Sequence, residues 1–262
     1  MIKTLGMSIT GPGKQRCEDA HLITHLKNGS VVAAIADGVG SARFSDKAAQ
    51  LAVREVSTFL KKNQCISEAF EHTFSKIATL IKRENGDVGD YDITLTVALY
   101  DGNKISYGHS GDGGIVAQRL DGKIIAVTKP QKGSDNLSVI PFRSCKSWVF
   151  GETKGVFSHV LMATDGVYDT LFPYLLRGQP NEVYMPMLKF FFDNTETDIH
   201  KYLTNATHIM DDKTVVIMSN TQLNPIQREP EYYAEPNWEK LKEEWNKKAY
   251  PHLYAKKNEE PK

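Results

Sequence analysis

The stretch VVAAIADGVGS, residues 31–41, ends an apolar run with an aspartate followed by a glycine. An Asp-Gly pair after a strand is most often the tight turn of a β-hairpin. Three other Asp-Gly pairs occur in the chain, at Asp101, Asp121 and Asp165. Asp101 and Asp121 stand between alternating segments and lead straight into another strand, so we interpret both as hairpin turns.

Asp37 and Asp165 stand in a different context. Each closes a nearly continuous apolar segment, VVAAIA or HVLMAT, and is followed by a small or apolar residue and then by helical sequence. A helix cap or a turn would explain either aspartate alone. However, two strand ends that present carboxylates at one rim are what a shared metal site requires. We therefore treat both aspartates as candidate metal ligands.

Other acidic residues also gather at the boundaries of predicted strands. Arg16-Cys17-Glu18-Asp19 precedes one strand, Asp211-Asp212 precedes the strand TVVIM, and Asp112 lies in the stretch GDGG. Solvated strand entrances and a sharp bend are the plain alternatives. The whole set offers hard oxygen ligands without a His/Cys cluster or an EF-hand spacing, which favours Mg²⁺ or Mn²⁺ over zinc, copper or calcium. Its members are Glu18, Asp19, Asp37, Asp112, Asp165 and Asp211.

The overall composition limits the possible partners. The chain has 262 residues, 40% of them hydrophobic, and its 32 Lys and Arg residues balance 32 Asp and Glu residues. This balance gives no global basic field, so we expect neither nucleic acid nor a membrane surface as a partner. The three scattered cysteines show no CxxC spacing and favour a reducing compartment. No segment reaches the ~18 apolar residues of a membrane span, so we expect a cytoplasmic protein.

The periodicity of the body predicts strands in meandering groups and helices in two blocks. The first helical block comprises residues 45–62 and 67–83, and the second comprises residues 168–208 with breaks near Gly178 and Asn194. This arrangement favours an α+β layered sandwich over a strictly alternating parallel sheet. The predicted strands are residues 2–9, 20–26, 31–36, 92–100, 104–109, 114–120, 123–128, 156–163 and 213–218.

The C-terminal segment differs from the body in composition. Residues 223–262 are rich in charge, Pro and Tyr, so we separate them as a tail from a catalytic domain at residues 1–222. Residues 237–249 are predicted to form a helix with Trp238, Leu241 and Trp245 on one face. That apolar stripe either packs on the chain's own body or docks on a partner.

Five motifs in order resemble one enzyme family. RCEDAH, AIADGVGSA, SGDGG, LMATDGVYD and DDKTVVIM are similar to those of the metal-dependent protein phosphatases of the protein phosphatase 2C type, and ADGVGSARFSDKAA is most similar to the bacterial branch. The resemblance covers about residues 7–219. It implies a four-layer α/β/β/α sandwich with two central antiparallel sheets and a helix pair on each outer side. It also implies a binuclear Mn²⁺ or Mg²⁺ site at one rim.

The same resemblance implies roles for individual residues. Asp37 matches the carboxylate that bridges two metal ions, and it acts in catalysis with Asp165 through metal-bound water. The two ions lower the pKa of a bridging water, which then attacks phosphoserine or phosphothreonine in line. The resemblance also implies that the Gly38 carbonyl and Glu18 bind one ion and that Asp165 and Asp211 bind the other. Asp112 matches a ligand of a weaker third ion. Asp19 and Asp212 match residues that contact the ligands rather than the ions.

Three positions depart from the family pattern. Lys14 stands where an arginine usually binds the substrate phosphate, and Arg16 follows two residues later, so either residue is a candidate for that role. Val39 replaces a histidine that is thought to protonate the leaving group in some members. Asp212 replaces a common asparagine, and its extra charge either tightens metal binding or faces solvent.

The segment Thr128 to Lys154 is the least family-like part of the body. In this family the corresponding region forms a flap beside the active site that influences substrate choice. Its basic residues either face a phosphorylated partner or are only solvated. They are Lys129, Lys132, Arg143 and Lys146.

The predicted function is a phosphoprotein phosphatase that acts as a monomer and opposes a serine/threonine kinase. A pseudophosphatase that binds phosphoproteins or a kinase is one alternative. It is disfavoured because Glu18, Asp37, Asp165 and Asp211 are all present. A hydrolase of small phosphoesters is the second alternative, and the sequence leaves it open.

Overall fold

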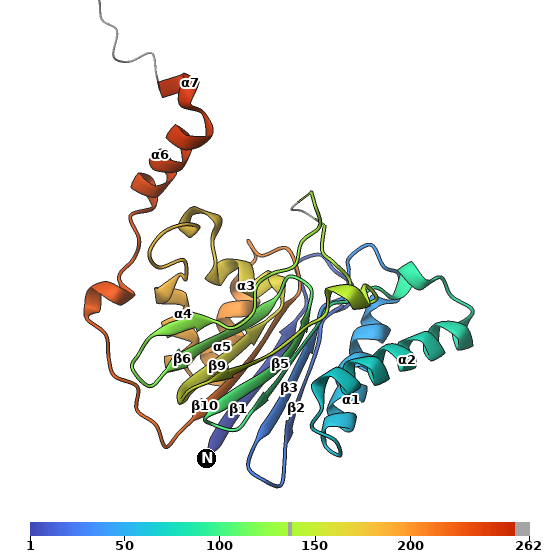
Figure 1. Cartoon of the computed structure of the whole chain (residues 1–262). Helices are drawn as coiled ribbons and strands as arrows, with labels where there is room; N and C mark the ends of the chain where they lie inside the picture. The colour runs from blue at the N-terminus through green and yellow to red at the C-terminus, as the bar shows by residue number, and fades with distance from the viewer. Residues whose placement is uncertain (136–137, 255–262) are drawn as a thin grey trace, which may run out of the picture.

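The computed structural model of the chain describes residues 1–135 and 138–254. Two antiparallel five-stranded sheets form its centre (Figure 1). The first sheet has the order β1 (Ile2–Ile9), β10 (Lys213–Asn220), β9 (Phe157–Ala163), β6 (Gly114–Arg119) and β7 (Ile124–Ala126). The second has the order β2 (Ala20–His25), β3 (Val31–Ala36), β4 (Leu95–Tyr100), β5 (Lys104–Ser110) and β8 (Val149–Lys154).

Helices cover the outer face of each sheet, which confirms the expected four-layer α+β sandwich (Figure 1). The second sheet carries α1 (Ser45–Leu60) and α2 (Ile66–Glu84). The first sheet carries α3 (Asp165–Leu171), α4 (Met185–Asp193) and α5 (Glu196–Asn205). The expectation of a helix pair on each side is therefore wrong for the first sheet. The breaks at Gly178 and Asn194 divide its helical block into three short pieces.

The apolar strands alternate between two cores, which explains why their sequences look continuously hydrophobic. In β3, Val31, Ala33 and Ile35 pack in the core between the sheets, whereas Val32 and Ala34 pack against the helices. All six residues of β3 are buried. Burying one valine or isoleucine side chain stabilises a fold by roughly 1.5–3 kcal/mol, so such a strand is a rigid support for the residue that follows it.

One strand, β8, was not predicted. It pairs with β5 at the edge of the second sheet and ends the segment that we interpret as a flap. Its side chains are mostly exposed, including Val149 and Phe150, so it lacks the alternating burial that marks the other strands. Residues 136 and 137 of the same segment lie outside the described residues.

Strand register brings the candidate residues of the second sheet together. Ala20 at the start of β2 pairs with Ala36 at the end of β3. Glu18 and Asp19, which precede β2, therefore lie at the same rim as Asp37, which follows β3.

The first sheet delivers its acidic residues to the same rim. Ala163 at the end of β9 pairs both with Gly114 at the start of β6 and with Val215 near the start of β10. The segments that precede β6 and β10 and follow β9 therefore meet at one place. They carry Asp112, Asp211 and Asp165.

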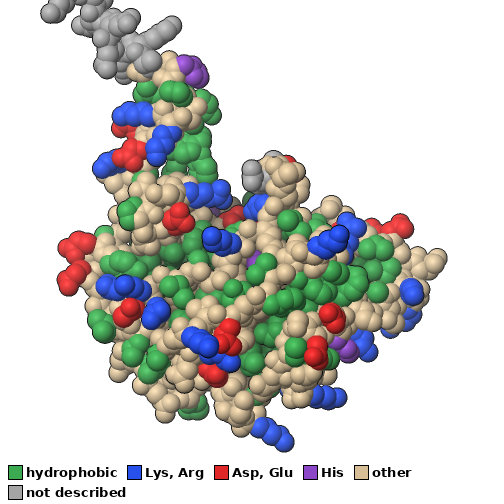
Figure 2. All heavy atoms as spheres, in the orientation of Figure 1, with side chains coloured by type: hydrophobic (Ala, Val, Ile, Leu, Met, Phe, Trp, Pro, Cys, Tyr) green, Lys and Arg blue, Asp and Glu red, His purple; other side chains and the backbone are tan. Residues whose placement is uncertain are grey.

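The tail runs along the outside of the first sheet and then rises beside the rim (Figure 1). It passes through a short 3₁₀ helix, η4 (Pro230–Tyr233), into α6 (Trp238–Ala249) and α7 (Pro251–Tyr254). Figure 2 shows α6 and α7 as a column, with side chains of both charges, that stands above the body. Residues 255–262 lie outside the described residues.

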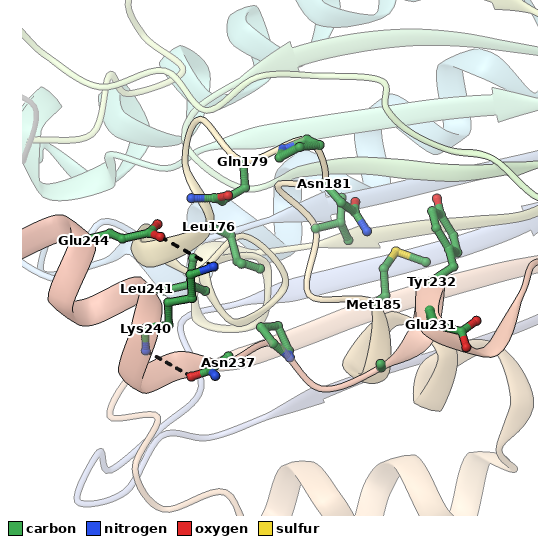
Figure 3. Close-up of a pocket in the computed structure, with 14 residues that line it drawn as sticks. Leu176, Gln179, Asn181, Met185, Glu231, Tyr232, Asn237, Lys240, Leu241 and Glu244 are labelled. Carbon is green, nitrogen blue, oxygen red and sulfur yellow. Dashed lines mark hydrogen bonds and ion pairs between the residues drawn. The ribbon is translucent and has the colours of Figure 1, made fainter.

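The apolar stripe of α6 packs on the chain's own body. The ring of Trp238 lies 5.3 Å from that of Tyr184, and the ring of Trp245 lies 5.1 Å from that of Tyr174. Leu241 faces Leu176 across the pocket drawn in Figure 3. These contacts favour the first of the two interpretations of the stripe. The domain boundary at residue 222 stays a prediction. None of the described helices has the length and apolar character to span a membrane.

Candidate metal centre

Three carboxylates form the tightest acidic group of the rim. Asp37, Asp112 and Asp165 each place an oxygen within 4.8 Å of the others. They come from the end of β3, the β5–β6 turn and the first residue of α3. Asp37 and Asp165 are 128 positions apart in the sequence. The fold therefore brings together three candidate ligands from distant segments of the chain.

The buried oxygens of this region fit a divalent cation. Asp19 Oδ1, Asp112 Oδ1 and Asp165 Oδ1 are buried and have no hydrogen-bond partner among the described residues. A buried carboxylate oxygen without a donor is costly, and a cation removes that cost. The donors are all hard oxygens, which suits Mg²⁺ or Mn²⁺. The residues present therefore fit the expected ions.

Burial also changes the acidity of these groups. It raises the pKa of Asp37 well above the usual range, and the charges of Asp19 and Asp165 act in the same direction. Burial, followed by the charges of Asp112 and Asp211, raises the pKa of Asp165 to about 7. Without a cation, the centre therefore holds protons near neutral pH, and a bound cation would displace them.

Asp19 ties the two sheets together behind the centre. Its Oδ2 accepts a hydrogen bond of 2.8 Å from Thr164 Oγ1, and that oxygen in turn accepts one from Thr214 N–H. Burial raises the pKa of Asp19 to about 6, although hydrogen bonds with Asp37 and Thr164 oppose this effect. The paired ends of β2 and β3 thus place the carboxyl groups of Asp19 and Asp37 close enough for each to change the pKa of the other.

Glu18 and Asp211, the other candidate ligands, meet around a lysine instead. Lys14 Nζ lies 3.4 Å from Glu18 Oε2 and also forms an ion pair with Asp211. Burial would lower the pKa of Lys14, but the hydrogen bond and charge of Asp211 outweigh it and raise that pKa. The residue expected to bind phosphate therefore lies among expected metal ligands.

Asp212 is the anchor of this side, and it does not face solvent. Its side chain is 1% exposed. One carboxylate oxygen accepts a hydrogen bond from Gly11 N–H, and the other accepts one from Glu18 N–H, both at 2.7 Å. Lys14 Nζ lies 3.2 Å from the second oxygen. The carboxylate therefore holds the β1–β2 loop, and with it Glu18, against the start of β10.

Gly38 is required by close packing. A Cβ at this position would lie 2.7 Å from Ser45 Cβ and 2.9 Å from Glu18 Cβ. The Ser45 hydroxyl donates a hydrogen bond of 3.3 Å to Glu18 Oε1. The glycine after Asp37 therefore lets the start of α1 and the Glu18 side chain approach the end of β3.

The flap contributes one basic residue to the centre. Lys132 Nζ lies 3.3 Å from Asp112 Oδ2, and Gln131 fixes the flap base by exchanging hydrogen bonds with Gly111. Arg143 instead pairs with Asp92 at 2.7 Å. The other two basic residues of the flap, Lys129 and Lys146, form no ion pair with any described residue.

Sequence reasoning did not single out Arg43 and Phe44, which lie beside the centre. With Lys14, Arg16 and Glu18 they line a pocket of about 420 Å³. Arg16 donates to the Arg43 carbonyl at 2.5 Å and pairs with Asp46 at 3.3 Å. Arg43 is the basic residue at the end of the motif ADGVGSAR, and this position was the one indication of a role beside the centre. Nothing in the sequence places it near the loop that carries Lys14.

His109 has a structural role. Its ring hydrogen-bonds Thr96 Oγ1 at 2.9 Å and the Lys129 carbonyl at 3.0 Å. Burial lowers its pKa to about 4, so the ring is neutral at pH 7. It therefore links β4 to the flap base, and it is a poor general acid at neutral pH.

Comparison with known proteins identifies the family. The family model described as Protein phosphatase 2C matches residues 12–208, which is more than half of the chain. The chain therefore belongs to the protein phosphatase 2C family, as the sequence motifs indicate, and is an enzyme of that class. Comparison with curated protein sequences gives no match.

Solved structures of bacterial phosphatases share the fold. A bacterial serine phosphatase superposes with a TM-score of 0.66 at 12% identity, over 87% of this chain and 100% of its own. The serine/threonine phosphatase Stp1 from Staphylococcus aureus gives 0.65 at 13% identity, over 84% and 95%. The catalytic domain of the serine/threonine protein phosphatase PstP, in complex with two manganese ions, gives 0.63 at 17% identity, over 83% and 97%.

Proposed function

We propose that the chain hydrolyses phosphoserine and phosphothreonine in proteins and uses two Mn²⁺ or Mg²⁺ ions. The observation that carries this proposal is the group formed by Asp37, Asp112 and Asp165, whose oxygens lie within 4.8 Å of one another at the rim. Family membership supports the phosphatase class. The manganese-bound state of PstP, a structural neighbour, supports the choice of metal.

In this proposal each acidic residue has a defined place. Asp37 lies between the two sides of the rim and would hold both ions. Glu18 and the Gly38 carbonyl would hold one ion, whereas Asp165 and Asp211 would hold the other. Asp19 and Asp212 position these groups through the contacts described above. When bound, the ions would activate a water molecule at neutral pH and neutralise charge on the phosphoryl group.

Asp112 is the candidate for a weaker third ion. Lys132 already pairs with one of its oxygens. A third ion would therefore have to displace this lysine or share the carboxylate with it.

The basic residues next to the centre bind and orient the substrate in this proposal. Lys14 pairs with the candidate ligands Glu18 and Asp211, and Arg16 lies in the same pocket. A lysine offers a point charge rather than the two parallel donors of an arginine, so we expect modest phosphate affinity. Val39 offers no proton for the leaving group, and neutral His109 is held by other partners.

The proposal is tested by phosphate release from a phosphothreonine peptide. The purified protein is assayed with EDTA, Mg²⁺ or Mn²⁺, beside the variants Asp165→Asn and Asp121→Asn. Asp121 is a matched control because it also precedes a glycine but lies in a hairpin turn, where it accepts a hydrogen bond from Lys123 N–H. We expect metal-dependent release that only Asp165→Asn abolishes.

Other outcomes of this assay are equally informative. Release of phosphate from small phosphoesters but not from the peptide would replace the protein substrate with a small molecule. No release with any metal, from protein whose circular dichroism shows it to be folded, would contradict the enzymatic proposal and favour a phosphoprotein-binding role.

A further inference from the structure

The pocket beside the metal centre is lined by several basic side chains. Three of its six lining side chains are cationic, Lys14, Arg16 and Arg43, and Glu18 is its only carboxylate. Its volume of about 420 Å³ is large enough for a carboxylate or phosphate group with its hydration. Lys14 and Glu18 also belong to the centre itself, so the pocket opens directly beside the place where a phosphoryl group would be hydrolysed.

The three cations differ in whether their charged groups already have partners within the chain. Lys14 contacts three carboxylates, and Arg16 is paired with Asp46 and bonded to the Arg43 carbonyl. The guanidinium of Arg43, by contrast, forms no hydrogen bond or ion pair with any described residue. Its donors are therefore available to an anionic ligand.

The surroundings of Arg43 favour a fixed anion site. Its guanidinium lies 5.1 Å from the centre of the Phe44 ring, a contact that restricts its position. The next residue, Ser45, begins α1, whose N-terminus carries no side-chain cap. A helix N-terminus attracts negative charge. Asp46 offsets part of this attraction, but Arg16 neutralises it in turn.

We propose that Arg43 gives this pocket a second anion subsite, next to the Lys14 and Arg16 that orient the phosphoryl group, and that the subsite selects substrates with another negative group beside the phosphorylated residue. The proposal rests on the phosphatase function proposed above. Successive residues of an extended peptide lie about 3.3–3.6 Å apart, so a neighbouring side chain reaches the pocket while the phosphoryl group lies at the centre. An acidic side chain and a second phosphoryl group share the required chemistry.

The test compares three peptides that each carry one phosphothreonine. Their neighbouring residue is alanine, aspartate or phosphoserine. The ratio of kcat/KM between an anionic and the neutral peptide is measured for the wild type, Arg43→Ala and Arg54→Ala. Arg54 is a matched control because it is an exposed arginine on α1, the helix that begins two residues after Arg43, but it does not line the pocket.

We expect the wild type to prefer the anionic peptides and Arg43→Ala to lower that preference by about two- to fivefold, the range for a partly exposed charge pair. Arg54→Ala should retain the preference, and added salt should weaken it. The difference between the aspartate and phosphoserine peptides identifies the better anion. An equal preference in Arg43→Ala and wild type would overturn the subsite.

A binding measurement separates failure of the subsite from failure of the proposed function. Fluorescence anisotropy with the labelled phosphothreonine-phosphoserine peptide, in EDTA, reports binding without turnover. Weaker binding by Arg43→Ala than by Arg54→Ala supports the subsite even if no peptide is hydrolysed. Equal binding by both variants contradicts it, whatever the activity of the wild type.

Discussion

The two ends of the acidic rim differ in the source of their positive charge. At the end built by the β1–β2 loop and β10, the Lys14 ammonium lies among the carboxylates, so the chain itself supplies a cation. At the other end, Asp37 and Asp165 lie close together, and the pKa values of both are raised.

The two ends thus show two ways in which one chain keeps a concentrated acidic site folded. A tethered lysine stabilises one end permanently. At the other end Lys132 pairs with Asp112, so Asp37 and Asp165 depend on protons or on an external cation.

The largest effect is expected for Asp37→Asn. Loss of the central carboxylate should lower phosphatase activity by roughly 10²- to 10³-fold, the scale for losing one preorganised catalytic group. The same change should raise the Tm of the metal-free protein, because the asparagine amide can donate to Asp19 without a bound proton. Phosphate release and thermal unfolding in EDTA measure the two effects. A lower Tm in EDTA would show that the buried Asp37 carboxyl group does not destabilise the metal-free protein.

Metal-free stability should depend on pH with a definite sign. Asp19 and Asp165 have an ordinary pKa of 3.8, and in the folded protein these pKa values rise to about 6 and about 7. Their contribution to stability is therefore fully present below pH 3.8 and is lost as the pH rises to about 7. In EDTA, Tm should fall over this interval, and Mn²⁺ should reduce the fall. If Asp165→Asn does not change the fall of Tm at the upper end of this pH interval, Asp165 is not the source of that pH dependence.

Asp212→Asn should destabilise the lysine end. An asparagine side chain has one acceptor oxygen, so it can accept from only one of the Gly11 and Glu18 N–H groups. Its amide nitrogen would face the other N–H group, and two donors cannot form a hydrogen bond with each other. We expect a loss of about 1–3 kcal/mol in the free energy of unfolding, measured with urea in EDTA. Asp211→Asn is the control, since that side chain is 46% exposed. An equal loss in both variants would mean that Asp212 is not the anchor.

The smallest effects concern the lysines. Lys14→Met removes a charge that competes with an ion for Glu18 and Asp211, so Mn²⁺ should bind about tenfold tighter by calorimetry. Among the described residues Lys132 forms an ion pair with Asp112 alone, and Lys132→Met should tighten binding by about two- to threefold. Lys129→Met on the same flap should have no effect. Weaker Mn²⁺ binding by Lys14→Met would assign this lysine a supporting rather than a competing role.

The central strands of the body were largely predictable because strands such as β3, β4 and β6 are buried on both faces. β3 is an example, with a continuous run of six buried apolar residues. β8 could not be predicted, since Val149 and Phe150 are exposed and only pairing with β5 makes the segment a strand.

The membership of the acidic set was also predictable, but its internal contacts were not. The sequence motifs identify Asp37 and Asp165 as residues at strand ends. They contain no information on the contact between Lys14 and Asp211, which are 197 positions apart, or on the burial of Asp212. Such contacts depend on sheet register, which is set by the whole fold.

The pairing of β1 with β10 also determines when the centre can form during synthesis. Ile9 pairs with Lys213, and Gly11 bonds to Asp212, which is 201 positions later. At translation rates of roughly 5–20 residues per second, the N-terminal strand waits about 10–40 s for its partner. The catalytic rim is therefore among the last parts of the molecule to assemble, and a nascent chain remains inactive until almost the whole domain has emerged.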